Sequence, residues 1–159
     1  MNRRYRSWVL VVVLLLICAP AAFAKSYVPK SNTRAAIKAY VKSAAKVVAK
    51  SGPSCETFKG KDWMGGDYYV FVTGPDDKTV CHPNASNIGR DNADIVDANG
   101  AKVGMMFTAA SKKKGGGWVE YVWPRPGQTT PVKKSSYATR VKAPDGKWYV
   151  VGSGGYELK

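Results

Sequence analysis

The sequence predicts an α+β domain in which a long N-terminal helix packs against a five-stranded antiparallel sheet, with a short helix in the connection between strands. Residues 34–51 repeat apolar side chains at helical spacing, and five later segments are rich in β-branched and aromatic residues. Short turns join most of those segments. Because one helix precedes two runs of strands separated by a single long connection, we expect an antiparallel sheet with its helices on one side.

The first element is the helix over 34–51, whose apolar residues recur three and four positions apart. Thr33 and its neighbours are good N-cap residues, and Gly52 followed by Pro53 is typical of a helix end. Lysines occupy every fourth position on another face, at Lys38, Lys42, Lys46 and Lys50. Such a stripe can contact nucleic acid, but it is more often the solvated face of an amphipathic helix, which is what we expect.

The strands follow in two groups. Residues 67–73 and 78–82 predict a hairpin across a Gly-Pro-Asp-Asp turn, and the polar stretch 84–99 predicts an ordered loop. Residues 101–113 predict the short helix. Three further strands are expected at 118–124, 131–142 and 148–156. The first of these carries large rings on both faces, which either fill a core or line a small-molecule pocket.

The first 24 residues have the pattern of a secretory signal peptide. Arginines precede the apolar run Trp8–Cys18, and Ala22-Phe23-Ala24 is a cleavage sequence, so we expect a cut after Ala24. The apolar run is shorter than the roughly 20 residues that span a bilayer. We therefore expect a periplasmic or secreted protein with an extended leader at 25–32 and one domain at 33–159. Retention of the segment as an anchor stays open.

Two cysteines remain after that cut, Cys55 and Cys81. An even number in an exported chain favours a disulfide, with two buried thiols as the alternative. The chain carries 25 Lys and Arg against 11 Asp and Glu, a net charge of +14 that becomes +11 once the three arginines of the signal are removed. Such a charge attracts polyanions, anionic lipid surfaces and acidic proteins without naming a partner.

Six fragments in order resemble the single Cache sensor domain, a PAS-like extracellular module, over about Thr33 to Glu157. They are 67–72, 80–84, 89–91, 116–124, 133–137 and 151–154. The resemblance implies one ligand pocket on the sheet face, usually for a small organic acid. Most relatives are the outer parts of chemoreceptors or sensor kinases. We expect no membrane helix after Lys159 and no signalling domain, and therefore a stand-alone binding domain whose partner would be a membrane sensor or receptor.

The predicted ligand site gathers rings and polar groups of the sheet. Its residues are Tyr69, Phe71, His82, Trp118, Tyr121, Trp123, Lys134 and Tyr137. His82, the sole histidine, would either orient a ligand or cap the strand end. Lys134 beside tyrosine hydroxyls would bind a carboxylate through charge-assisted hydrogen bonds, whereas an exposed lysine is the common alternative. Lys134 and Tyr137 point to opposite faces of an ideal strand, so only one should reach the pocket unless a β-bulge intervenes.

Catalysis finds little support in the sequence. It contains no G-x-S-x-G, H-E-x-x-H or phosphate-binding loop, and its cysteines are far from a C-x-x-C arrangement. We expect no enzymatic activity, no cofactor, no metal and no nucleic-acid partner. The leading hypothesis is an exported binder of a carboxylate-bearing metabolite. A basic module that binds a polyanion or an acidic protein is second, and a secreted enzyme with His82 as base is third.

Overall fold

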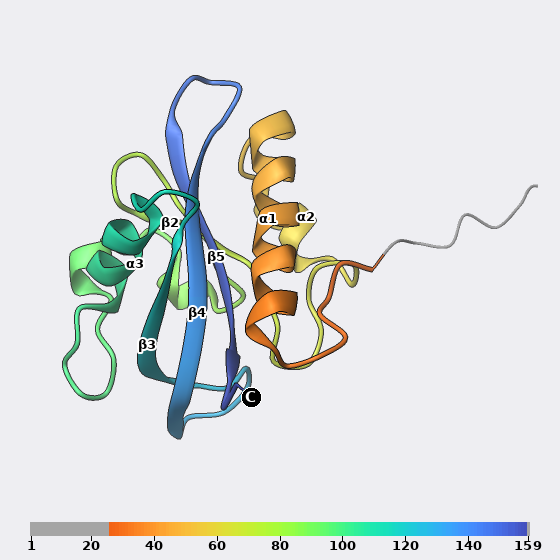
Figure 1. Cartoon of the computed structure of the whole chain (residues 1–159). Helices are drawn as coiled ribbons and strands as arrows, with labels where there is room; N and C mark the ends of the chain where they lie inside the picture. The colour runs from red at the N-terminus through yellow and green to blue at the C-terminus, as the bar shows by residue number, and fades with distance from the viewer. Residues whose placement is uncertain (1–25, 159) are drawn as a thin grey trace, which may run out of the picture.

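The computed structural model describes residues 26–158, so the predicted signal peptide and its cut after Ala24 lie outside the described residues. Three layers make up this part of the chain: a long helix, a sheet and a shorter helix (Figure 1). The elements are α1 (Arg34–Ser51), α2 (Cys55–Lys59), β1 (Phe71–Thr73), β2 (Thr79–Cys81), α3 (Val103–Ser111), β3 (Gly117–Pro124), β4 (Pro131–Lys142) and β5 (Trp148–Tyr156). Two 3-10 helices, Ala85–Asn87 and Asn92–Asp94, lie between β2 and α3.

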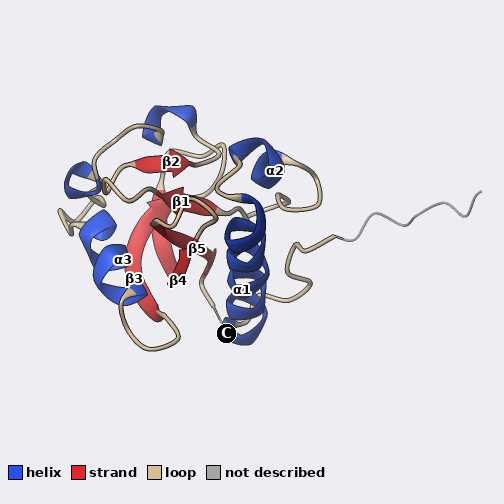
Figure 2. Cartoon of the chain, turned by 90° about the horizontal axis from the view of Figure 1, so that it is seen from above, coloured by secondary structure: helices blue, strands red, loops and turns tan. Residues whose placement is uncertain are grey.

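The described strands form one antiparallel sheet of five, in the order β2-β1-β5-β4-β3, which confirms the predicted α+β class. The chain crosses from the β2 edge to the β3 edge through the long connection that contains α3. The prediction that the helices share one side of the sheet is wrong. Figure 2 shows α1 and α3 on opposite sides, because the crossover covers the face that α1 leaves free.

Helix α1 has the predicted bounds and the predicted caps. The Thr33 hydroxyl accepts a hydrogen bond from the Ala36 amide, and Gly52, at φ 80°, donates its N–H to the Val48 carbonyl. Such an N-cap contributes about 1 kcal/mol. The apolar stripe of α1 is buried against β4 and β5. The long N-terminal helix of the predicted fold is therefore present and packed.

Strands β1 and β2 are shorter than the predicted segments 67–73 and 78–82. Ahead of β1, the Ser153 hydroxyl donates to the Tyr69 carbonyl at 2.6 Å, so a side chain replaces a ladder hydrogen bond of the main chain. The connection after α1 contains the short helix α2, and the predicted disulfide Cys55–Cys81 joins α2 to β2, with 4.9 Å between the Cα atoms. Its 26-residue separation corresponds to about 3 to 4 kcal/mol on the chain-entropy view.

Alternation along the strands divides the interior into two cores. The core on the α1 face includes Val72, Tyr137 and Val151, and the core on the α3 face includes Phe71 and Ala138. Within residues 26–158, no helix combines the length and apolarity needed to cross a bilayer.

Candidate ligand-binding pocket

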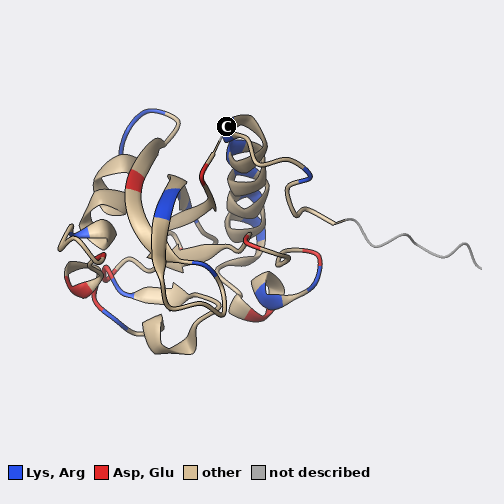
Figure 3. Ribbon diagram, turned by 90° about the horizontal axis from the view of Figure 1, so that it is seen from below, with Lys and Arg blue, Asp and Glu red and all other residues tan. Residues whose placement is uncertain are grey.

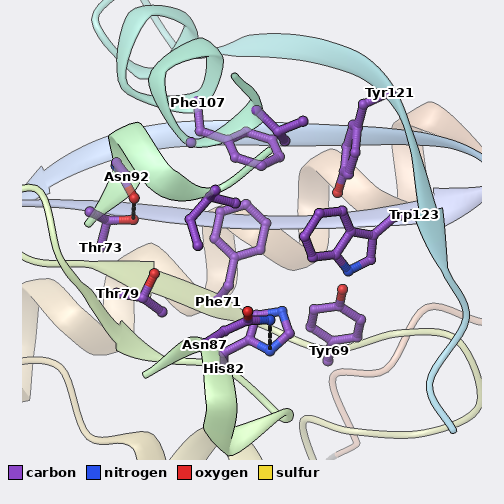
Figure 4. A pocket seen from close by; sticks show the side chains of 13 residues that line it. Tyr69, Phe71, Thr73, Thr79, His82, Asn87, Asn92, Phe107, Tyr121 and Trp123 are labelled. Carbon is purple, nitrogen blue, oxygen red and sulfur yellow. Dashed lines mark hydrogen bonds between the residues drawn. The ribbon is translucent and has the colours of Figure 1, made fainter. Parts of the chain in front are cut away.

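A cavity of about 40 Å³ lies between the sheet and α3. Figure 4 shows its walls, which come from the segments between Tyr69 and Trp123. The residues that line it are Tyr69, Phe71, Thr73, Thr79, His82, Asn87, Asn92, Ile95, Val103, Gly104, Phe107, Tyr121 and Trp123. The rings of Phe71, Phe107 and Tyr121 follow one another in contact, with centroids 4.6 and 5.5 Å apart. The walls are thus mainly apolar, with a few polar groups, as is typical of small-ligand pockets.

Five of the predicted site residues line this cavity: Tyr69, Phe71, His82, Tyr121 and Trp123. Their convergence depends on the sheet order, which brings the segment before β1, the end of β2 and the middle of β3 around α3. Figure 4 shows the Tyr69 hydroxyl and the Trp123 indole nitrogen facing one another at the end of the cavity remote from Asn92.

The structure places Trp118 and Tyr137 elsewhere. Both lie on the α1 face, with ring centroids 5.4 Å apart, and Tyr137 donates its hydroxyl proton to the Gly115 carbonyl. Cations of α1 cover them, since the Arg34 guanidinium lies 4.6 Å from the Trp118 ring and the Lys38 ammonium 5.4 Å from the Tyr137 ring. The sheet therefore separates these two rings from the cavity.

Lys134 is 1% exposed and lies behind Tyr69, just outside the cavity. Its ammonium donates to the hydroxyls of Tyr69 at 2.8 Å and Tyr156 at 3.2 Å. The same nitrogen lies 4.1 and 4.4 Å from the centroids of those two rings. Burial lowers the pKa of Lys134 to about 7, although the charge of Asp67 opposes this. Asp67 itself is ion-paired with Arg125, and among the described residues Lys134 has no carboxylate partner.

The contacts of Tyr69 engage both its oxygen and its proton. Its oxygen accepts from Lys134 and from the indole N–H of Trp123, and its hydroxyl donates to the Tyr156 oxygen, whose own proton goes to the Pro124 carbonyl. Burial raises the pKa of Tyr69 well above its ordinary value, and burial also raises the pKa of Tyr121. Both hydroxyls are therefore protonated donors at neutral pH. The Tyr121 hydroxyl is likewise engaged, with the Ser136 hydroxyl at 2.9 Å.

His82 enters the cavity directly after β2. Its Nδ1 accepts from the Asn84 amide at 3.0 Å, so the proton of the neutral ring is on Nε2. The Asn87 amide nitrogen lies 3.3 Å from the same Nδ1, and the ring packs edge-on against Tyr69 at 5.1 Å. Burial and the positive charge of Lys134 lower the pKa of His82 to about 4. At neutral pH, His82 is therefore an uncharged hydrogen-bond donor.

Sequence reasoning missed the wall formed by the crossover, above all Asn92. Its side chain is 2% exposed, accepts from the Thr73 hydroxyl at 3.4 Å and donates to the Thr108 hydroxyl at 3.0 Å. Gly104 makes this approach feasible, since a Cβ there would lie 2.2 Å from the Asn92 carbonyl oxygen. The sequence does contain one indication of this wall, the helical spacing of Val103 and Phe107, because the apolar face that they form must be buried against another part of the fold.

A wider depression of about 890 Å³ adjoins the cavity. Four residues line both spaces, namely Tyr69, His82, Asn87 and Trp123, so they stand between the cavity and the open groove. The rim includes the loops around Arg90 and Arg125. Asp97 fixes one rim to the sheet, because one of its carboxylate oxygens accepts from the Val122 amide at 3.1 Å. The groove therefore forms the mouth of the cavity.

Fold and site together define a class: an α+β domain that encloses a small cavity against one face of its sheet. Residues 54–159 match the sequence model of a protein family described as the Cache domain. Because this match spans more than half of the sequence, the chain belongs to the Cache domain family.

Individual relatives point the same way. The methyl-accepting chemotaxis protein McpP of Pseudomonas putida is 34% identical over 92 residues, a match that covers 57% of this chain and 16% of McpP. The periplasmic sensor domain of a chemotaxis protein is 37% identical with a TM-score of 0.51, covering 57% of this chain and 61% of that one. A Cache chemosensory domain, described as showing the structural basis for carboxylic acid recognition, is 30% identical with a TM-score of 0.52, covering 76% and 73%. The chain thus spans a small part of McpP and most of one sensor domain.

Proposed function

We propose that this chain is an exported sensor domain that binds a carboxylate-bearing metabolite of about two or three carbons, without catalysis. A buried water needs roughly 10–15 Å³ of cavity. A cavity of about 40 Å³ therefore admits a ligand of only a few non-hydrogen atoms. A longer acid would have to extend past Tyr69 and Trp123 into the mouth.

The observation that carries the proposal is the buried amino group of Lys134, which lies beside the cavity with no carboxylate partner among the described residues. A buried charge without a partner is costly, so an anion bound next to it gains more than it would in water. The path runs through Tyr69, whose oxygen accepts from Lys134 and whose hydroxyl would turn from Tyr156 to donate to a bound carboxylate. A positive charge behind the hydroxyl strengthens that donation.

The remaining walls suit the rest of such a ligand. His82 offers a neutral N–H, while Phe71, Val103 and Phe107 offer an apolar surface for a short alkyl chain. A relative of 30% identity is described in terms of carboxylic acid recognition, and this supports the same ligand class here. A related periplasmic sensor domain supports a periplasmic location, with a membrane chemoreceptor as the partner that reads occupancy.

Thermal-shift measurements followed by calorimetry test this proposal. Acetate, propionate, lactate and pyruvate should raise the melting temperature, and propionamide, which has the shape of propionate without its charge, should not. Lys134→Met should weaken propionate binding by 10-fold or more, on the order of the 1.5–3 kcal/mol of a charge-assisted interaction. Lys133→Met removes the same charge from the adjacent exposed position of β4 and should bind like the parent. A folded protein that no short acid stabilises would refute the proposal.

A further inference from the structure

We propose that the exposed face of α1 docks this domain onto an anionic lipid bilayer. The contact surface is a lysine ridge made of Lys38, Lys42, Lys46 and Lys50, all exposed to solvent. With a rise of about 1.5 Å per residue, the ridge extends about 18 Å along a straight helix. The lysine ridge is separate from the ligand pocket, because none of these four lysines lines it.

The charge of the ridge is not neutralised within the domain. Helix α1 contains no acidic residue, and eight of the eleven acidic residues of the chain lie between Glu56 and Asp97. Figure 3 shows the Lys and Arg positions following one another along α1. Arg34 is paired with Glu120 at 2.5 Å, and Lys38 lies over the Tyr137 ring. Within the part of the chain that the structure describes, Lys42, Lys46 and Lys50 form no ion pair.

The chemistry of the surface favours lipid over a protein partner. The exposed positions of α1, all of which is described, carry only Lys, Arg, Ala and Ser. None of the large exposed hydrophobic side chains belongs to α1. Specific protein interfaces need an apolar or aromatic centre and are depleted in lysine. Mobile anionic headgroups need only a row of flexible cations, each of which contributes about fivefold to binding near an anionic membrane.

The position of α1 in the fold is consistent with this role. The cavity opens on the α3 side of the sheet, whereas α1 covers the other side (Figures 1 and 2). A domain that lies on a bilayer through α1 therefore keeps its pocket turned away from the lipid. Docking and ligand entry use opposite faces and do not compete.

The test measures binding to phosphatidylcholine vesicles with and without phosphatidylglycerol, using protein purified after export. Lys42→Gln, Lys46→Gln and Lys50→Gln are combined in one variant. The matched control combines Lys112→Gln, Lys113→Gln and Lys114→Gln, which removes the same charge from the exposed end of α3 on the other side of the sheet. Neutral vesicles report any binding that does not need anionic lipid, including binding through the apolar stretch 8–18.

We expect the parent to bind vesicles that contain phosphatidylglycerol, with affinity that falls as salt is raised. The α1 variant should lose about 100-fold in partitioning, and the α3 variant should lose much less. Circular dichroism and propionate binding, unchanged in both variants, would show that each is folded. Equal losses in the two variants would overturn the proposal, as would a parent that ignores phosphatidylglycerol. Binding to polyphosphate or duplex DNA alone, with no vesicle binding, would likewise overturn it in favour of a soluble polyanion.

Discussion

The two faces of the sheet are made by the same strands and are filled in opposite ways. On the α1 face, Ile37, Val41 and Val151 are fully buried in a continuous apolar core. On the α3 face, Ile95 and Phe107 stand around a cavity that polar groups also reach. Dense packing stabilises a fold, whereas side chains that line a cavity lack van der Waals contacts on the side that faces it. The α1 face therefore holds the domain together, and the α3 face is the one free to bind.

Ile→Ala substitutions, one on each face of the sheet, should change stability by different amounts and give the largest effect. Ile37 is 0% exposed in the α1 core, and Ile95 is 9% exposed at the cavity wall. Ile37→Ala should lower the free energy of unfolding by about 3–4 kcal/mol, because its neighbours cannot fill the new space. Ile95→Ala should cost about 1–2 kcal/mol, since that side chain already lacks neighbours on one side. Urea unfolding followed by tryptophan fluorescence measures both values.

The same pair should differ in binding. Ile95→Ala enlarges the cavity and should shift the ligand preference toward acids with one more carbon, whereas Ile37→Ala should leave that preference unchanged. Equal losses of stability in the two variants would show that both faces are equally well packed, and the contrast between them would be removed.

The next effect concerns pH and belongs only to the α3 face. Burial and Lys134 lower the pKa of His82 in the folded state from its ordinary 6.5 to about 4. The folded state thus takes up the proton less readily than the unfolded chain. Neutral, buried His82 therefore contributes to the free energy of unfolding in full above pH 6.5, and this contribution is lost as the pH falls toward 4. After allowance for partial solvation of the ring, we expect a loss of about 2 kcal/mol over that range.

His82→Gln supplies the control, because glutamine does not titrate. The difference in unfolding free energy between parent and variant should shrink steadily as the pH is lowered from 7 to 4. A constant difference would mean that the folded and unfolded states protonate His82 alike, which would contradict its burial in the cavity wall.

Much of the fold could be predicted because local patterns determine it. The bounds of α1, β4 and β5 follow from periodicity, caps and turn residues, and they match the expected ranges. The side of the sheet that α3 covers was predicted wrongly, because it depends on how the long connection crosses the sheet. Gly152 shows the same limit. A Cβ there would lie 2.2 Å from the Phe71 ring, and this close approach cannot be predicted from the sequence around Gly152 or around Phe71.

The ligand site, like the fold, could be predicted only where local sequence patterns determine it. Strand alternation alone puts Tyr121 and Trp123 on one face of β3 and Trp118 on the other, yet only the neighbours of each strand decide which face contains space. Asn92 could not be predicted, because it reaches the cavity through a connection whose course is tertiary. The burial of Lys134 also runs against the usual exposure of lysine, and it depends on Tyr69 and Tyr156, which come from two different parts of the chain.

The smallest effect is the pH dependence of ligand affinity, which tests whether Lys134 contributes to binding on the α3 face. Burial lowers the pKa of Lys134 from 10.5 to about 7. A bound carboxylate would favour the charged form, so propionate affinity should be full below pH 7 and should fall above it, by up to about tenfold per pH unit. The groups that face the ammonium do not titrate near pH 7, because burial raises the pKa of Tyr69 and raises that of Tyr156 to about 12, while the pKa of His82 is lowered to about 4.

Calorimetry at pH 8 in buffers of different ionisation enthalpy should detect proton uptake with the ligand. Lys134→Met should bind weakly without this pH dependence, and a parent whose affinity stays flat from pH 6 to 9 would remove Lys134 from the recognition of the acid.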